Sequence, residues 1–183
     1  MTYTIEEHKH RFAAWAACRA ASVNRCRFSV EDGKAILEEA GLNPLLIRNP
    51  DHLPNPRCFD AAHRQWREAV IVAARKRGLE DFTHGVAAKL INIYLKSRFV
   101  CGGHHNHARV RAIHPPIDSI LLDKLYSEKS ENFAKLQDAW RKAKHIRWSK
   151  FNSKDYEDLI QNIRLAMQGA ALWEVEQYWQ GYQ

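Results

Sequence analysis

The most informative feature of this sequence is a stretch that lacks acidic side chains. No aspartate or glutamate occurs in the segment 83–117, although the chain of 183 residues contains 21 acids. The first carboxylate after the gap is Asp118, which follows the pair Pro115 and Pro116. Lysines, arginines and five histidines lie within the gap. We therefore expect this segment to contact a polyanion or to hold a lysine in its neutral form.

Other absences narrow the class of protein. The four cysteines show no CxxC spacing, and the N-terminus lacks the apolar segment of a signal peptide. These two features predict a reduced, cytoplasmic setting. No run approaches the roughly 20 apolar residues that a membrane helix needs, so we expect no membrane partner. The sequence also contains no internal repeat and no low-complexity tract.

The composition is that of a globular protein with an acidic partner. Hydrophobic residues make up 45% of the chain and charged residues 27%, which excludes a disordered chain. A chain of 183 residues can bury a core as a single helical domain over 1–183, or as two packed lobes with a cleft near 83–122. The formal net charge of +7 favours nucleic acid as the partner.

Helix signals occur along the whole chain, and no segment alternates as a strand would, so the predicted fold class is all-α. Thr4 and Glu7 have the spacing of a capping box and predict a helix over 4–23, with Phe12 and Trp15 facing the core. Asp60 is expected to cap a long helix that ends before Gly78. Further helices are predicted over 29–41, 86–99, 132–143 and 153–168, at the prolines 115 and 116, and after Gly169. Ser153 is expected to cap the helix over 153–168. The segments 43–56 and 101–107 are predicted loops.

One part of the acid-free stretch resembles a known family. The segment 85–89 reads Gly-Val-Ala-Ala-Lys, and 114–118 reads His-Pro-Pro-Ile-Asp. Together they resemble the signature of the helix-hairpin-helix DNA glycosylases of the bifunctional 8-oxoguanine type. The resemblance is confined to this part of the chain, and Ala87 stands where the family's hairpin has its second glycine.

The resemblance implies a fold, an activity and a set of site residues. It implies a compact helical domain with a helix-hairpin-helix architecture that binds double-stranded DNA, excises a base and cleaves the abasic site, with no cofactor. Lys89 would match the lysine nucleophile and Asp118 the catalytic aspartate. The hairpin that grips DNA would be formed by Gly85, Val86 and Ala87.

The chemistry of these side chains agrees with such a role. A lysine attacks the sugar C1′ only as the neutral amine, and partial burial or nearby cations lower its pKa toward that state. A carboxylate such as Asp118 would oppose the positive charge that builds on the sugar as the glycosidic bond breaks. The simpler interpretations are that Lys89 is a solvated helix residue and that Asp118 only stabilises a helix N-terminus.

Further residues are candidates for contacts with DNA. The aromatic C-terminal segment, including Trp173 and Trp179, could line a pocket for an extruded base, or could simply dock on the core. The basic run 141–154 carries six cations and no acid, interleaved with Trp148 and Phe151, and suits either a nucleic-acid surface or a solvated helix end. Candidate phosphate contacts in the acid-free stretch are Lys96, Arg98, Asn106, Arg109, Arg111 and His114.

Two other functions remain open from the sequence. The chain could be a helical DNA-binding protein that keeps the hairpin but not the reaction. It could also bind zinc through a histidine-rich loop, although the spacing of the possible ligands fits no standard zinc pattern, and our prediction is that no metal binds. Those possible ligands are Cys101, His104, His105 and His107, with His114 nearby.

Overall fold

The computed structural model describes residues 3–43 and 45–181, and within these ranges the predicted all-α class is confirmed. Every regular element there is helical, and the only β pairing is an isolated bridge between Val23 and Cys26. In chain order the elements are α1 (Ile5–Ala21), α2 (Val30–Glu39), η1 (Pro50–His52), η2 (Pro56–Cys58), α3 (Phe59–Arg75), α4 (His84–Leu95), the π-helical turn η3 (Lys96–His104), α5 (Ala108–Arg111), α6 (Ser119–Ser127), α7 (Glu131–Ala134), α8 (Gln137–Ile146), η4 (Trp148–Lys150), α9 (Ser153–Met167) and η5 (Leu172–Tyr178).

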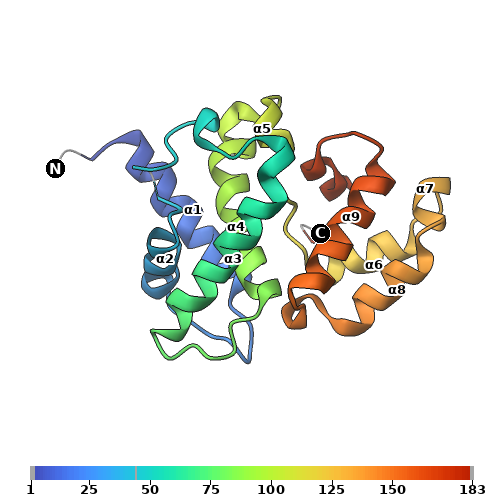
Figure 1. Cartoon of the computed structure of the whole chain (residues 1–183), viewed down its shortest axis with the longest axis horizontal. Coiled ribbons are helices and arrows are strands. Elements are labelled where there is room, and N and C mark those ends of the chain that lie inside the picture. The colour runs from blue at the N-terminus through green and yellow to red at the C-terminus, as the bar shows by residue number, and fades with distance from the viewer. Residues whose placement is uncertain (1–2, 44, 182–183) are drawn as a thin grey trace.

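The buried apolar side chains form two clusters, one on each side of α4. The first cluster is built mainly from α1 to α4, and the second from α6 to α9 and η5. Figure 1 shows the corresponding two groups of helices side by side, with α1 to α5 in one and α6 to α9 in the other. Ala87 belongs to the first cluster and Ala88 to the second, while Trp148 packs against both. The helix α4 therefore forms part of both cores.

Several helix boundaries follow from the local signals read in the sequence. The Thr4 hydroxyl accepts a hydrogen bond from the Glu7 amide and begins α1. Ser29 and Asp32 form a reciprocal capping box at the start of α2. Gly41 and Gly78 both have positive φ, of 86° and 76°, just beyond the helices that they end.

Two predicted caps are wrong, because neighbouring residues hold those positions. Cys58, not Asp60, is the N-cap of α3, and the Asp60 carboxylate instead binds Arg164 of α9 and His114 in the segment before α6. Asn152, not Ser153, caps α9 in a reciprocal box with Asp155.

The prediction that Phe12 and Trp15 face the core is also wrong. Their exposed fractions are 59% and 50%, and their rings lie near each other on the outer face of α1 with centroids 5.9 Å apart. Apart from His10, the buried face of α1 consists of small side chains, which allow α1 and α4 to approach closely. Those small residues are Ala13, Ala14, Ala17, Cys18 and Ala21.

Two helical segments differ from the expected lengths. The chain does not leave the helix near Phe99 but continues through the π-helical turn η3, in which Gly103 has φ of 89°. The expected helix over 132–143 is divided into α7 and α8 at residues 135–136. Phe133 and Trp140 lie on either side of this break and both become buried, with their rings stacked at 6.0 Å. The break thus places two aromatic side chains in the same core.

The N-terminus of α4 contacts the turn η4 through a glycine. A Cβ atom at Gly85 would lie 1.8 Å from the Trp148 carbonyl oxygen. The Gly85 amide donates a hydrogen bond to the Phe151 carbonyl at 3.2 Å, and the Thr83 hydroxyl donates to the Ser149 carbonyl at 2.9 Å. The residue type at position 85 is therefore set by the close approach of another segment of this chain.

This approach predicts that Gly85→Ala destabilises the protein. The new methyl group would force the 148–151 segment away from α4, at a cost of about 1–3 kcal/mol in the free energy of unfolding. Urea denaturation followed by circular dichroism measures that change. Gly102→Ala is the matched control, because the nearest atom to its Cβ would be 3.9 Å away. Equal stability of the Gly85→Ala and wild-type proteins would contradict the proposed contact.

Candidate active site between the two groups of helices

The candidate lysine and aspartate meet at the junction of the two cores. The Lys89 Nζ atom donates a hydrogen bond to Asp118 Oδ2 at 2.9 Å. Thr83 caps α4 through the Val86 amide, which places Lys89 in the second turn of that helix. Asp118 is the N-cap of α6, and its Oδ1 accepts a hydrogen bond from the Leu121 amide at 2.9 Å. One carboxylate therefore caps a helix and binds the lysine at the same time.

Two indole rings surround this ion pair. The Lys89 ammonium lies over the Trp148 ring, 5.1 Å from its centroid. The indole Nε1 of Trp179 donates a hydrogen bond to Asp118 Oδ2 at 3.0 Å. Together with the neighbouring helices, these rings leave Lys89 only 5% exposed.

Burial sets the protonation behaviour of the cluster. Removal from water lowers the pKa of Lys89, and the negative charge of Asp118 opposes that shift in part. Nearby, Glu176 forms an ion pair with Lys96. Burial raises the pKa of Glu176 above the usual glutamate value, with the positive charges of Lys96 and Lys89 acting against it. The site therefore contains two amines and two carboxylates in a poorly hydrated region.

A cavity of about 530 Å³ lies beside this cluster. Lys96 and Glu176 form part of its wall, together with Trp173 and with Val100 and Cys101 of η3. Lys89 and Asp118 are not among the residues that line it. In this conformation the cavity reaches the second ion pair of the cluster rather than the lysine itself.

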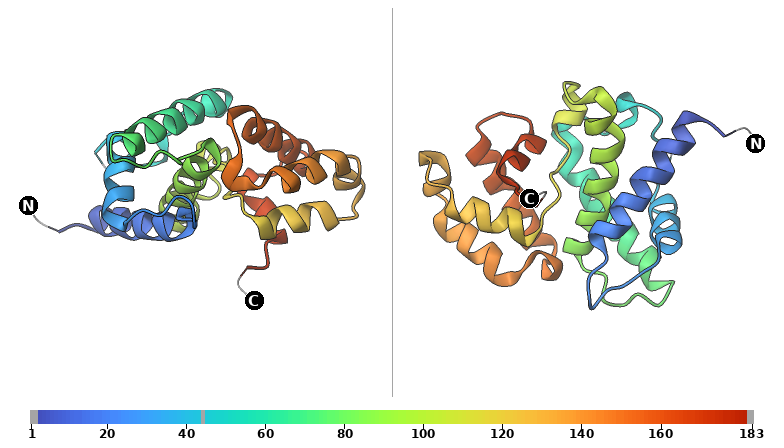
Figure 2. Two further views of the ribbon diagram at one scale, coloured as in Figure 1. Left: turned by 90° about the horizontal axis from the view of Figure 1, so that it is seen from below. Right: turned by 180° about the vertical axis from the view of Figure 1, so that it is seen from behind.

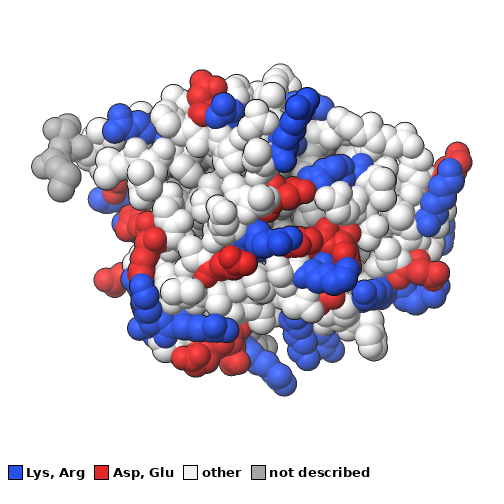
Figure 3. All heavy atoms as spheres, viewed as in Figure 1, with Lys and Arg blue, Asp and Glu red and all other residues white. Residues whose placement is uncertain are grey.

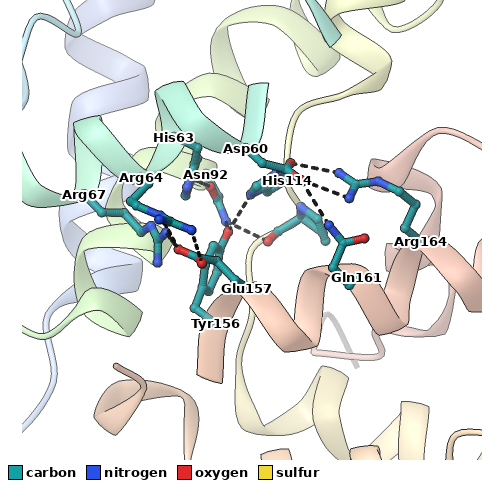
Figure 4. A network of polar contacts seen from close by, with 11 residues as sticks. Asp60, His63, Arg64, Arg67, Asn92, His114, Tyr156, Glu157, Gln161 and Arg164 are labelled. Atoms are coloured by element: carbon teal, nitrogen blue, oxygen red, sulfur yellow. Dashed lines mark hydrogen bonds and ion pairs between the residues drawn. The ribbon is translucent and has the colours of Figure 1, made fainter. Parts of the chain in front are cut away.

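A second polar group connects the two sets of helices (Figure 4). His114, in the segment before α6, hydrogen-bonds Asp60 of α3 through Nε2 and the Tyr156 hydroxyl through Nδ1, both at 3.0 Å. Asn92 of α4 donates to the Pro115 carbonyl and to the Tyr156 hydroxyl. Because Asp60 is held ionised with a lowered pKa, His114 donates a hydrogen bond from Nε2, and its Nδ1 accepts a hydrogen bond from the Tyr156 hydroxyl. This network fixes the segment that carries Asp118.

Several residues predicted to contact DNA are buried instead. The exposed fractions of Arg98 and His114 are 3% each. Arg98 donates to the Ile47 carbonyl and to Glu6, which lie on other elements of the first group. These two side chains act within the fold, so their prediction as phosphate contacts is wrong for this conformation.

The hairpin residues are also enclosed by the protein. Val86 and Ala87 are at most 1% exposed, and the amides of Gly85, Val86 and Ala87 all bond within the chain. The expectation that this hairpin grips DNA through its backbone is therefore not met in this conformation. The segment 148–151 occupies the approach to these amides.

The remaining predicted contacts lie near the surface, but most are engaged. Lys96 pairs with Glu176. Arg109 donates to the Leu53 carbonyl at 2.6 Å, and Arg111 lies 3.7 Å from Glu174. Asn106 is exposed. On the face shown in Figure 3, acidic and basic side chains lie interspersed in small groups.

The two predicted base-pocket tryptophans occupy different positions. Trp173 lines the cavity beside Glu176 and meets His105 edge to face, with ring centroids 6.1 Å apart. Its indole nitrogen is buried and has no hydrogen-bond partner among the described residues. Trp179 contacts Asp118 directly. The structure thus places one ring at the cavity and the other on the carboxylate.

The histidine-rich segment does not form a ligand cluster in the described part of the chain. No group of three or more histidine, cysteine or acidic side chains there is arranged to hold a metal ion. His107 instead caps α5 and pairs with Asp51 at 3.2 Å.

Among the described residues, no helix combines the length and apolar character needed to cross a membrane.

Comparisons with known proteins add no relative to this description. No family model, no curated protein and no solved structure matches this chain.

Two residues of the site were not predicted from the sequence as site residues. Glu176 was not among the candidates, and Trp148 was considered only as part of a basic surface. The residues around Glu176 in the sequence do not indicate a role in the site, because its position depends on how η5 docks near α4.

The buried histidines predict how stability depends on pH. Burial holds the pKa values of His63 and His114 below the usual histidine value. The unfolded chain therefore binds protons first as the pH falls through about 6.5, and the free energy of unfolding decreases by up to about 1.4 kcal/mol per pH unit for each such group. This contribution is complete above the unfolded pKa and is lost below it.

Urea denaturation between about pH 7 and pH 5 measures this dependence. His114→Gln removes one titrating group and is expected to flatten the slope. The control is His145→Gln, an exposed position on α8, where the slope should match that of the wild-type protein. Stability that stays constant over this range in the wild-type protein would rule out the linkage.

Proposed function

We propose that this protein binds double-stranded DNA and removes a base by attack of the Lys89 amine on the sugar, followed by cleavage of the abasic site. The observation that carries the proposal is the 2.9 Å contact between Lys89 Nζ and Asp118 Oδ2, in a buried position between residues 29 apart in sequence. A poorly hydrated amine beside a carboxylate at the junction of two groups of helices suits a reaction that needs both groups at one carbon.

The roles of the two residues follow from their chemistry. Lys89 must lose its proton to become a nucleophile, and its burial favours that loss. The Nζ–C1′ bond forms as the bond from C1′ to the base breaks, and the departing base keeps the electron pair and takes up a proton. The ionised Asp118 then stabilises the positive charge on the sugar. The C1′–O4′ bond of the sugar then opens and O4′ takes up a proton, which leaves a protonated imine between Nζ and C1′. Loss of a proton from C2′ of this imine forms the C2′–C3′ double bond, breaks the C3′–O bond and releases the 3′ phosphate, which cuts the strand.

Access to Lys89 requires a movement. Lys89 is 5% exposed, its ammonium lies over the Trp148 ring, and Trp179 is bonded to its carboxylate partner. A nucleotide extruded from DNA reaches Nζ only when one of these rings is displaced. The cost of extruding a nucleotide, a few kcal/mol, would have to be met by contacts elsewhere on the DNA.

Borohydride trapping tests the proposed reaction. With a duplex that contains an abasic site, the wild-type protein should form an imine that borohydride reduces to a stable covalent adduct, seen as a shifted band on a denaturing gel. Lys89→Gln should abolish the adduct, and Asp118→Asn should slow its formation on the order of 10²–10³-fold. Lys135→Gln, an exposed lysine that directly follows α7, is the control and should trap at the wild-type rate.

A second candidate function is DNA binding without chemistry. The observation in its favour is that Lys89 is enclosed and bonded, as a purely structural ion pair would be. In that case the wild-type protein gives no adduct with the abasic duplex, while its affinity for DNA is the same with and without the abasic site.

A further inference from the structure

A second cavity, of about 460 Å³, lies at the start of α4 and is lined by three cations from two separate turns. Arg25 lies between Val23 and Cys26, which form the isolated β-bridge after α1, while Arg147 precedes η4 and Lys150 is its last residue. Asp81 is the single acid in this lining. The group therefore carries a net positive charge within one hollow of the surface, formed by segments more than a hundred residues apart in sequence.

The three cations of this cavity have no acidic partner among the described residues, unlike most basic side chains near Lys89. Lys96, Arg98 and Arg111 are each paired with a carboxylate. Arg25, Arg147 and Lys150 are exposed, and among the described residues none of them pairs with an acid. The negative charge of Asp81 can balance only one of the three positive charges. The remaining like charges repel each other, so an anion bound between them would relieve an unfavourable arrangement.

The turn that carries two of these cations is held in a fixed position. Arg147 has φ of 70° and ψ of 132°, a conformation that a residue with a Cβ atom seldom adopts. The turn is bonded to the start of α4 by the contacts of Thr83 with Ser149 and of Gly85 with Phe151. The backbone at Arg147 is therefore held relative to α4, and the ring of the adjacent Trp148 contacts the Lys89 ammonium.

We infer that this group is a binding site for backbone phosphates of a DNA strand. The two guanidinium groups offer paired N–H donors that match phosphate oxygens, and Lys150 adds a third charge. The site would supply through side chains the grip that the enclosed hairpin amides do not supply. The inference rests on the proposed function, since it makes the occupant a DNA strand rather than an acidic protein segment.

The salt dependence of DNA binding tests this site. Fluorescence anisotropy with a short labelled duplex of undamaged sequence gives the affinity at a series of salt concentrations. Each phosphate contact contributes about −0.9 to the slope of log K against log salt. The triple variant Arg25→Gln, Arg147→Gln, Lys150→Gln should flatten that slope by about 2–3 and weaken binding on the order of 100-fold near 0.1 M salt.

The matched control loses the same charge elsewhere. The triple variant Arg48→Gln, Arg57→Gln, Lys129→Gln changes three exposed cations that lie outside this cavity, and its slope should stay close to that of the wild-type protein. The single variant Arg147→Gly is compatible with the positive φ and removes one contact without a folding cost, so its slope should flatten by about 1. An unchanged slope in Arg147→Gly and in the cavity triple variant overturns the inference.

The salt-dependence experiment and the borohydride trapping experiment can succeed or fail independently of each other. If wild-type protein forms the borohydride adduct but the cavity variants bind DNA normally, the reaction stands and the phosphate site is wrong. If no adduct forms but the slope flattens as expected, the phosphate site stands and the proposed chemistry is wrong. If polyglutamate competes with the duplex at equal charge concentration, the occupant is an acidic polypeptide and the inference of a DNA phosphate fails.

Discussion

The ion pair between Lys89 and Asp118 is the contact on which the arrangement at the centre of the molecule depends. An ammonium group taken out of water costs several kcal/mol unless a partner compensates it. Asp118 is available for this purpose only because its other oxygen caps α6, which fixes the carboxylate relative to that helix. The pair thus joins α4 to α6 and at the same time creates a weakly hydrated amine. Structural and chemical roles coincide in one contact.

The structure explains the absence of acids from 83–117 by the burial of this segment among elements that supply the acids. Lys96 pairs with Glu176, Arg98 with Glu6, and His114 with Asp60, and each of these carboxylates comes from an element outside the segment. The stretch lies at the centre of the fold, and its neighbours in space supply the counter-charges. A gap that suggested an exposed basic surface therefore reflects burial. Local sequence cannot distinguish these two cases, because the compensating residues are up to 92 positions away.

The parts of the structure that could be predicted are those with local causes. The caps at Thr4 and Ser29 and the turns at Gly41 and Gly78 follow from a few adjacent residues. The all-α class follows from the same signals repeated along the chain. The encounter of Lys89 and Asp118 was expected only through the resemblance to a family, and not from spacing. By contrast, Phe12 and Trp15 point to solvent because alanines permit a closer contact with α4, a tertiary effect that periodicity does not contain.

The position of Trp148 has a consequence for how the molecule holds together. Its ring packs against both apolar clusters, and its carbonyl oxygen occupies the space left by the missing side chain of Gly85. Figure 2 shows the two groups of helices side by side, and ion pairs such as Asp60 with Arg164 and Lys96 with Glu176 also join them. If either group of helices were separated from the other, apolar side chains that now pack against Trp148 and α4 would be exposed to water. The protein should therefore resist division into independent modules, and two fragments cut at the connecting segment would regain their structure only by reassociating.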